Sequence, residues 1–145
     1  MDTRIGTPNS VTQPGWIPVS GFRLRKAGVQ FDAVRVDGEA GRRVADVLEA
    51  MTGGEPGPIV ADASGRRGVY FLVPAGSTSH RIWPAGAVRF NSGKGRVGYV
   101  PVPALWGRTW PLSWRCLPPA DGRFVHTLML RAVVREVLAG PDGPC

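Results

Sequence analysis

The sequence predicts an α+β domain, in which a mostly antiparallel sheet carries two main helices packed on one face. Two observations lead to this class. The expected elements follow the order strand, helix, several strands, helix, and the strands are short, apolar or alternating, and bounded by Gly, Pro and Ser. The 145 residues fit one domain, and a hydrophobic content of 43% is enough to bury one core.

The first strand and the first helix form a continuous unit. A strand is expected at 31–36, where two valines alternate with Arg35 and with Asp37 just beyond it. A helix is expected at 39–51, because apolar residues recur there on one helical stripe. Asp37 precedes this helix as a candidate N-cap, and Gly53-Gly54 ends it.

The rest of the chain alternates between short strands and turns. Four more strands are expected at 58–61, 69–73, 87–90 and 99–102. Residues 91–95 join the last two of these strands and have the composition of a turn. Two shorter segments are candidate strands, Trp16–Val19 and Trp114–Leu117. The second helix is expected at 125–138, after the turn at Asp121-Gly122.

The boundaries of the domain follow from composition. Residues 1–15 are expected to be a flexible lead-in, 16–139 a single domain, and 140–145 a disordered tail. No apolar run approaches the roughly 20 residues of a membrane span, and the N-terminal segment lacks the apolar stretch of a secretory leader. Cys116 and Cys145 make neither a disulfide framework nor a zinc site. We therefore expect a cytoplasmic protein with no membrane partner.

Charge is distributed unevenly along the chain. The formal net charge is +7, and no Asp or Glu lies between Asp62 and Asp121. Cations and tryptophans alternate in that segment: Arg66, Arg67, Arg81, Trp83, Arg89, Lys94, Arg96, Trp106, Arg108, Trp110, Trp114 and Arg115. Cations neutralise phosphates and aromatic faces stack on bases, so the segment predicts a nucleic-acid surface. The alternative is that the tryptophans pack inside and the arginines are only solvated.

Three segments, in order, resemble a known family. They are FDAVRVD at 31–37, ASGRRGVYFLVP at 63–74, and VRF at 88–90 followed by GYVPVP at 98–103. They are similar to the N-terminal catalytic domain of bifunctional DNA primase/polymerases, a branch of the archaeo-eukaryotic primase superfamily, and in particular to its short actinobacterial members. The resemblance covers about 31–119 and implies an RRM-like, primase-polymerase-like sheet.

The departures from that family concern its catalytic residues. The family holds two divalent metals on clustered carboxylates, including an Asp-x-Asp pair that here reads Arg35-Val36-Asp37. Asp32 is expected on the opposite face of the strand, because side chains alternate. The family's phosphate-contacting His aligns with Gly68, and no acid is available between 63 and 120.

The first hypothesis is therefore a primase/polymerase-like domain that lacks catalysis and binds nucleic acid or nucleotide phosphate through a basic face. No cofactor is expected for it, and Arg35 offers a fixed cation where the family holds a metal. That substitution is consistent with binding a phosphate without metal and equally with plain loss of function. DNA or a nucleotide is the expected partner. The candidate phosphate contacts are Arg35, Arg66, Arg67, Arg89, Lys94 and Arg96.

Two alternatives stay open. One is an active, metal-dependent DNA primase/polymerase that holds Mg²⁺ or Mn²⁺ through Asp37, Asp62 and Asp32. The other is a protein-interaction module that uses Trp106–Trp114 as an exposed apolar patch.

Other chemistries have less support in the sequence. His80 and His126 are isolated, with no Cys nucleophile at a recognisable spacing. Gly93-Lys94-Gly95 is too short for a P-loop and is typical of a turn.

Overall fold

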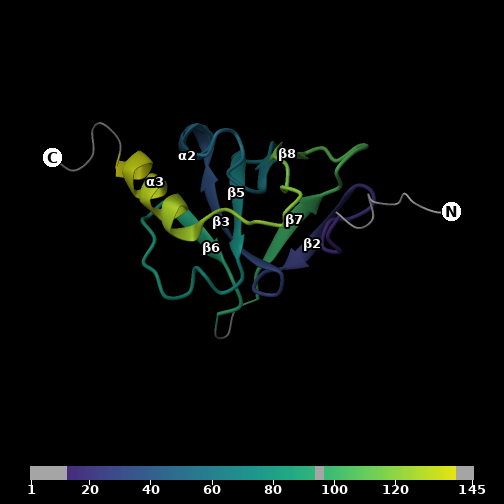
Figure 1. The fold of residues 1–145 in the computed structure, drawn as a ribbon, viewed down its shortest axis with the longest axis horizontal. Helices are drawn as coiled ribbons and strands as arrows, with labels where there is room; N and C mark the ends of the chain where they lie inside the picture. Colours follow the sequence, from purple (N-terminus) through teal and green to yellow (C-terminus); the bar gives the residue numbers. More distant parts are fainter. Residues whose placement is uncertain (1–12, 94–96, 140–145) are drawn as a thin grey trace.

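A computed structural model describes residues 13–93 and 97–139 of the chain (Figure 1). In those ranges the chain forms β2 (Phe22–Lys26), β3 (Phe31–Asp37), α2 (Gly38–Met51), β4 (Ile59–Asp62), β5 (Gly68–Pro74), β6 (Ala87–Phe90), β7 (Tyr99–Pro103), β8 (Leu112–Cys116) and α3 (Thr127–Ala139). Most of the predicted lead-in, the predicted tail at 140–145, and two predicted site residues, Lys94 and Arg96, lie outside the described residues.

Five strands form one antiparallel sheet in the order β6-β3-β5-β4-β8. Strands β3 and β4 both pair with β5 in antiparallel fashion, so they run parallel to each other, and α2 makes the crossover between them. This is a split β-α-β unit. It brings the end of β3, the start of β5 and the end of β4 together at one edge of the sheet.

Both helices pack on one face of this sheet (Figure 1). Each helix is amphipathic, because its apolar residues recur with the helical period and form one stripe. This stripe faces the sheet and is buried against it. Gly41 lets α2 approach β3, because a Cβ atom at this position would lie 2.2 Å from the Val36 carbonyl oxygen. The buried residues of this helix-side core are Val34, Val36, Val44, Ala45, Leu48, Ile59, Val69, Phe71, Val73, Val125, Leu130, Val133 and Val134.

A second sheet covers part of the opposite face. It consists of β2 and β7. Val100 and Val102 of β7 point toward the large sheet and are fully buried. Trp16 fills the space beside them, with its ring centre 5.2 Å from that of Phe31 and 5.8 Å from that of Phe124. The domain therefore has three layers: helices, the five-stranded sheet, and the β2–β7 sheet (Figure 1).

The predicted α+β class, with a mostly antiparallel sheet and two helices on one face, is confirmed. The two helices and six of the strands, including the candidate at Trp114–Leu117, lie within a few residues of their predicted bounds. The predicted strand at Trp16–Val19 is wrong, because Trp16 and Ile17 are core residues in an irregular segment. The strand lies instead at 22–26, where Arg25 Nε donates a hydrogen bond to the Trp16 carbonyl oxygen at 2.9 Å.

Strands β6 and β7 do not pair with each other, although they are consecutive in the sequence and separated by turn residues. Strand β6 is an edge of the five-stranded sheet next to β3, whereas β7 pairs with β2. These two strands therefore belong to different sheets.

Candidate functional site

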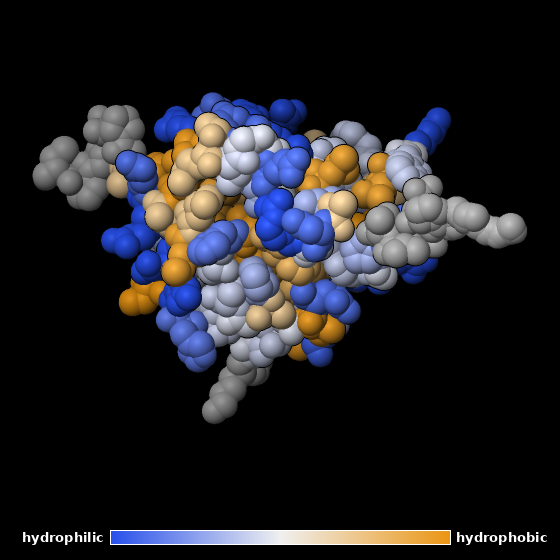
Figure 2. All heavy atoms as spheres, in the orientation of Figure 1, coloured by the Kyte–Doolittle hydropathy of each residue, from blue (hydrophilic) through white to orange (hydrophobic). Residues whose placement is uncertain are grey.

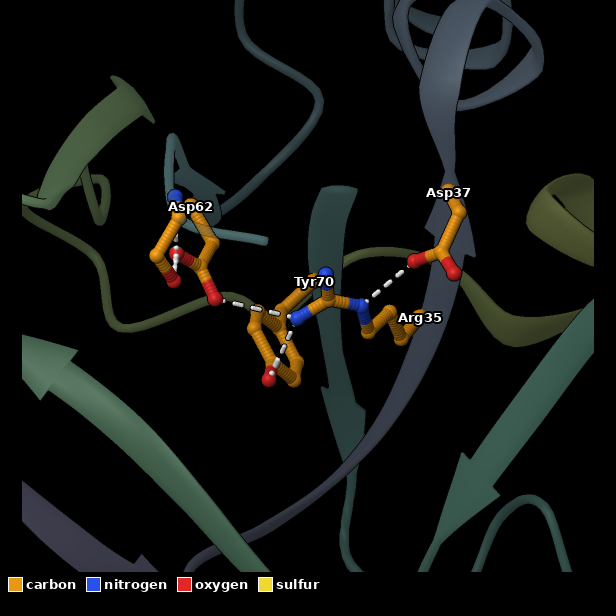
Figure 3. A network of polar contacts seen from close by, with 5 residues as sticks. Arg35, Asp37, Asp62 and Tyr70 are labelled. Carbon is orange, nitrogen blue, oxygen red and sulfur yellow. Dashed lines mark hydrogen bonds and ion pairs between the residues drawn. The ribbon is translucent and has the colours of Figure 1, made fainter. Parts of the chain in front are cut away.

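A polar network crosses three neighbouring strands on the face of the large sheet that lies opposite the helices (Figure 3). Arg35 Nε donates to Asp37 Oδ1 at 2.6 Å, and Arg35 Nη1 donates to Asp62 Oδ2 at 3.0 Å and to Tyr70 Oη at 2.8 Å. The guanidinium carbon lies 4.9 Å from the centre of the Tyr70 ring, within the range of a cation–π contact. Arg35 therefore bridges two carboxylates, and we call these four side chains the Arg35 network.

The strand register explains why these residues meet. Arg35 and Asp37 are two positions apart on β3 and share a face. Their partners on β5 are Tyr70 and Gly68, and Gly68 in turn pairs with Asp62 of β4. A Cβ atom at Gly68 would lie 2.7 Å from Arg35 Nε and 2.7 Å from Asp37 Oδ1. The glycine thus leaves the space between the two carboxylates in which the guanidinium lies.

The surroundings favour the charged forms of Asp62 and Arg35. Burial raises the pKa of Asp62, but hydrogen bonds from Ser64 and then from Arg35 outweigh it, so the pKa lies below its usual value. Burial lowers the pKa of Arg35, but its bonds to Asp37, Tyr70 and Asp62 outweigh that effect and raise it above its usual value. The site therefore contains one guanidinium ion-paired with two carboxylates.

Asp32 lies apart from this network, on the helix side of β3. It is fully buried, and its Oδ2 accepts hydrogen bonds from the Thr78 amide at 3.1 Å and the Thr78 hydroxyl at 2.8 Å. Its Oδ1 has no partner among the described residues. The structure does not bring Asp32 together with Asp37 and Asp62, which the metal-dependent hypothesis requires.

The described ranges, 13–93 and 97–139, contain no group of three or more His, Cys, Asp or Glu side chains that could hold a metal ion. In the Arg35 network, Asp37 and Asp62 each accept a hydrogen bond from the guanidinium that separates them. The described residues therefore do not fit a two-metal centre, which needs clustered carboxylate oxygens that are free to coordinate. Of the two histidines, His80 is exposed, and His126 Nδ1 accepts a hydrogen bond from an amide of the first turn of α3.

A pocket of about 190 Å³ borders the Arg35 network and includes Asp62 in its wall. Its walls come from the start of α2, the end of β4, the β4–β5 turn and β8. Three arginines from different elements, Arg42, Arg67 and Arg115, also line it. Arg42 pairs with Glu39, and both are exposed, so solvent screens that pair strongly. Arg115 is also paired with acidic residues, so among the described residues Arg67 is the one lining arginine without an ion pair.

Arg115 is the most constrained of the three arginines. Its guanidinium pairs with Glu49 at 2.8 Å and with Asp46, both on α2. The hydrogen bond from Arg115 lowers the pKa of Glu49. The neighbouring Cys116 thiol also donates to Glu49, at 3.1 Å, and burial together with this carboxylate raises the pKa of Cys116 to about 12. Arg115 therefore ties β8 to α2.

The predicted phosphate contacts occupy different environments. Arg66 and Arg67 are exposed on the β4–β5 turn, beside the pocket. Arg89 lies on β6, and its Nη1 donates to the carbonyl oxygens of Thr78 at 3.0 Å and Arg81 at 3.2 Å. Arg89 therefore holds the β5–β6 connection in place.

The four tryptophans of the acid-free segment also divide into two groups. Trp83 packs against the helix-side core, and Trp114 Nε1 donates to two backbone carbonyl oxygens around the end of β7, at 3.1 and 3.2 Å. Trp106 and Trp110 are 70% and 79% exposed. Trp83 and Trp114 therefore pack inside, as the alternative interpretation of these tryptophans expected, whereas Trp106 and Trp110 are exposed.

Sequence reasoning missed Tyr70 and Arg42 as site residues. Tyr70 lies directly across from Arg35, a relation that requires the register of β3 on β5. Arg42 lies on a polar face of α2, which the sequence pattern assigns to solvent. Only the tertiary structure places this face beside β8 and the β4–β5 turn.

Comparison of the chain with protein-family models, with curated proteins and with solved structures finds no match. Among the helices that the structure describes, neither is long and apolar enough to cross a membrane.

Proposed function

We propose that this chain is a primase-polymerase-like domain without a metal centre, and that it binds nucleic acid through phosphate contacts around the β4–β5 turn. The three segments that resemble the primase/polymerase family correspond to β3, to the β4–β5 turn with β5, and to β6 and β7. The observation that carries the proposal is the position of Arg35 between Asp37 and Asp62.

The Arg35 network supports the absence of catalysis. In two-metal phosphoryl transfer, carboxylates hold the ions that stabilise the attacking and leaving oxygens. Here an internal cation occupies the space between Asp37 and Asp62, and Gly68 makes room for it. The substitutions Arg at 35 and Gly at 68 are therefore physically coupled, since the guanidinium lies where a larger side chain at 68 would start.

The β4–β5 turn supports phosphate binding. Arg67 has a φ of +51°, a left-handed conformation that costs a residue with a side chain about 1 kcal/mol. Its carbonyl oxygen accepts a hydrogen bond from the Gly38 amide at 2.7 Å, so the turn is fixed against the first residue of α2. The positive end of the helix dipole adds to the charge of Arg66 and Arg67 there. A phosphate at this turn would contact the positive end of the α2 dipole, which is fixed, and the exposed side chains of Arg66 and Arg67, which can move.

The test is fluorescence anisotropy of a fluorescein-labelled single-stranded DNA at two salt concentrations. The test variant carries Arg66→Gln and Arg67→Asn, because Asn tolerates the left-handed conformation. The matched control carries Arg43→Gln and Arg135→Gln, which remove the same charge from exposed positions on α2 and α3. We expect affinity to fall about tenfold in the test variant, with a shallower salt dependence, and to fall much less in the control.

Equal losses in the two variants would show that only net charge matters and would overturn the assignment to the β4–β5 turn. Failure of the wild-type protein to bind DNA even at low salt would overturn the proposed function itself.

The catalytic alternative has its own assay, nucleotide incorporation on a primed template with Mg²⁺ or Mn²⁺. We expect no incorporation above background. Incorporation that Asp37→Ala abolishes would establish the enzyme instead.

A further inference from the structure

The outer side of the β2–β7 sheet exposes apolar and aromatic side chains. Val100 and Val102 of β7 point inward to the core, so the alternating positions point to solvent. Phe22, Leu24 and Tyr99 occupy such positions and are 46%, 61% and 51% exposed. The register places Lys26 directly across from Tyr99. The sheet therefore presents rings and a cation side by side on a face with no covering layer in the described structure.

The loop after β7 carries two further exposed rings and an exposed cation. The Ala104 amide donates to the Gly21 carbonyl oxygen at 2.8 Å, so the loop starts beside the residue that precedes β2. Trp106 and Trp110 are the two most exposed aromatic residues described, and Arg108 between them is exposed as well. Figure 2 shows apolar and hydrophilic side chains mixed over the visible face, including the part where β2, β7 and β8 lie. We call this set the β2–β7 surface; its members are Phe22, Leu24, Lys26, Tyr99, Trp106, Arg108 and Trp110.

The β2–β7 surface carries positive charge without nearby acids in the sequence. Residues 13–31 and 97–112, which build it, contain no Asp or Glu. Within the described residues, Lys26 and Arg108 form no salt bridge, and Arg25 donates to a backbone carbonyl rather than to an acid. Surfaces that combine aromatic rings with cations and exclude acids are complementary to single-stranded nucleic acid, whose bases stack on the rings while the cations follow the phosphates.

We propose that the β2–β7 surface is a stacking platform for single-stranded nucleic acid, with Trp106, Trp110 and Tyr99 as the base contacts and Lys26 and Arg108 as the phosphate contacts. The inference rests on the proposed function and adds its substrate class. A duplex keeps its base faces stacked inside, so the rings gain nothing from it, and single strands are bound in preference. Because every base has a π-face, the platform discriminates little between sequences.

The experiment measures anisotropy of a fluorescein-labelled oligothymidylate and of a labelled duplex, with the full chain. The test variant carries Trp106→Ala and Trp110→Ala, and a second variant carries Trp106→Phe and Trp110→Phe, which keeps aromatic faces. The matched control is Ile82→Ala, a residue that is 84% exposed and lies outside the β2–β7 surface. We expect the alanine variant to bind the single strand about tenfold more weakly, and the phenylalanine variant and the control to stay within about threefold of wild type.

The salt dependence separates rings from charges. The tryptophan variants should keep the wild-type slope of affinity against salt, whereas Lys26→Gln with Arg108→Gln should make it shallower. Melting temperatures of all variants should match wild type, because the substituted side chains are exposed.

Three outcomes would overturn this inference. Single-strand binding that is weakened by changes at Arg66 and Arg67 but not at Trp106 and Trp110 would leave the proposed function standing and remove the platform. A dimer in sedimentation that dissociates in the alanine variant would assign the surface to a second copy of the chain. Tryptophan-dependent binding to anionic lipid vesicles, without binding to oligothymidylate, would assign it to a membrane surface.

Discussion

The two faces of the five-stranded sheet are covered in different ways. On one face, α2 and α3 enclose an apolar core, and acidic residues of α2 hold the cation of β8 in salt bridges. On the other face, the β2–β7 sheet buries its inner side but leaves aromatic residues and acid-free positive charge on its outer side. On the helix face, apolar side chains and charges contact other residues of the chain. On the β2–β7 face, aromatic side chains and cations are exposed to solvent.

This difference shows that composition alone does not locate a binding surface. Arg115 and Arg108 belong to the same acid-free segment, yet Arg115 is neutralised by α2 and Arg108 is exposed. Trp114 and Trp110 differ in the same way. Whether a cation or an aromatic ring belongs to a binding surface depends on how its strand or loop packs, which the composition does not show.

The largest expected effect comes from Trp16, which joins the β2–β7 layer to the large sheet. Trp16→Ala should lower the free energy of unfolding by about 4 kcal/mol, because it removes a ring that is 8% exposed and contacts Phe31, Trp114 and Phe124. The control is Trp106→Ala, which should change stability by less than about 0.5 kcal/mol. Urea denaturation measures both, and similar losses would break the distinction between inner and outer aromatic residues.

Gly41 tests how tightly the helix face is packed. Gly41→Ala should destabilise the protein by about 3 kcal/mol, since its Cβ atom would lie 2.2 Å from the Val36 carbonyl oxygen and force α2 away from β3. This is opposite in sign to the effect expected from helix propensity alone. Gly15→Ala, where a Cβ atom meets nothing within 4 Å, is the control, and a stabilised Gly41→Ala protein would contradict the packing described here.

Arg35 tests whether the network on the β2–β7 face of the large sheet is self-contained. Arg35→Met should cost about 2 kcal/mol at neutral pH, because it leaves Asp37 and Asp62 without their common cation. Adding Asp62→Asn to this variant should cost less than in the wild-type background, since the partner charge is already gone. Strictly additive losses in thermal or urea unfolding would show that the three side chains are not coupled.

The smallest expected effect is the acid dependence that Asp62 confers. Its pKa lies below the usual value in the folded protein, so its contribution is present at neutral pH and is lost as the pH falls through the folded-state pKa. Asp62→Asn should therefore be destabilised by about 1 kcal/mol at pH 7, and the difference from wild type should shrink below about pH 4. A difference that stays constant with pH would rule out the ionised carboxylate as its source.

The sequence predicted the positions of the helices and strands better than it predicted which strands pair with each other. Strands with apolar or alternating patterns and both helices were found, because burial on one side or both imposes a period. Strand β2 was missed because its apolar positions, Phe22 and Leu24, face solvent, so its pattern looks like a basic connector. The separation of β6 from β7 was missed because turn residues do not tell which strand comes next in the sheet.

The site was predictable in part. The orientation of Asp32 away from Asp37 followed from strand alternation and agrees with the structure. The partners of Arg35 could not be predicted, because they lie on β4 and β5 and meet it only through the pairing register and the space at Gly68. The predicted phosphate contact at Arg89 stays a prediction, but its bonds to the β5–β6 connection give it a structural role that no local pattern indicates.

The hydrogen bond between Cys116 and Glu49 gives the molecule a built-in reporter of local opening. Burial and the Glu49 carboxylate raise the pKa of Cys116 to about 12, which disfavours the reactive thiolate at neutral pH while β8 stays docked on α2. Alkylation of this thiol should therefore be slow in the docked state and faster when the strand separates from the helix. In a chain with Cys145→Ser, slow labelling would time the fraying of this sheet edge, and any ligand that clamps the neighbouring arginines would slow it further.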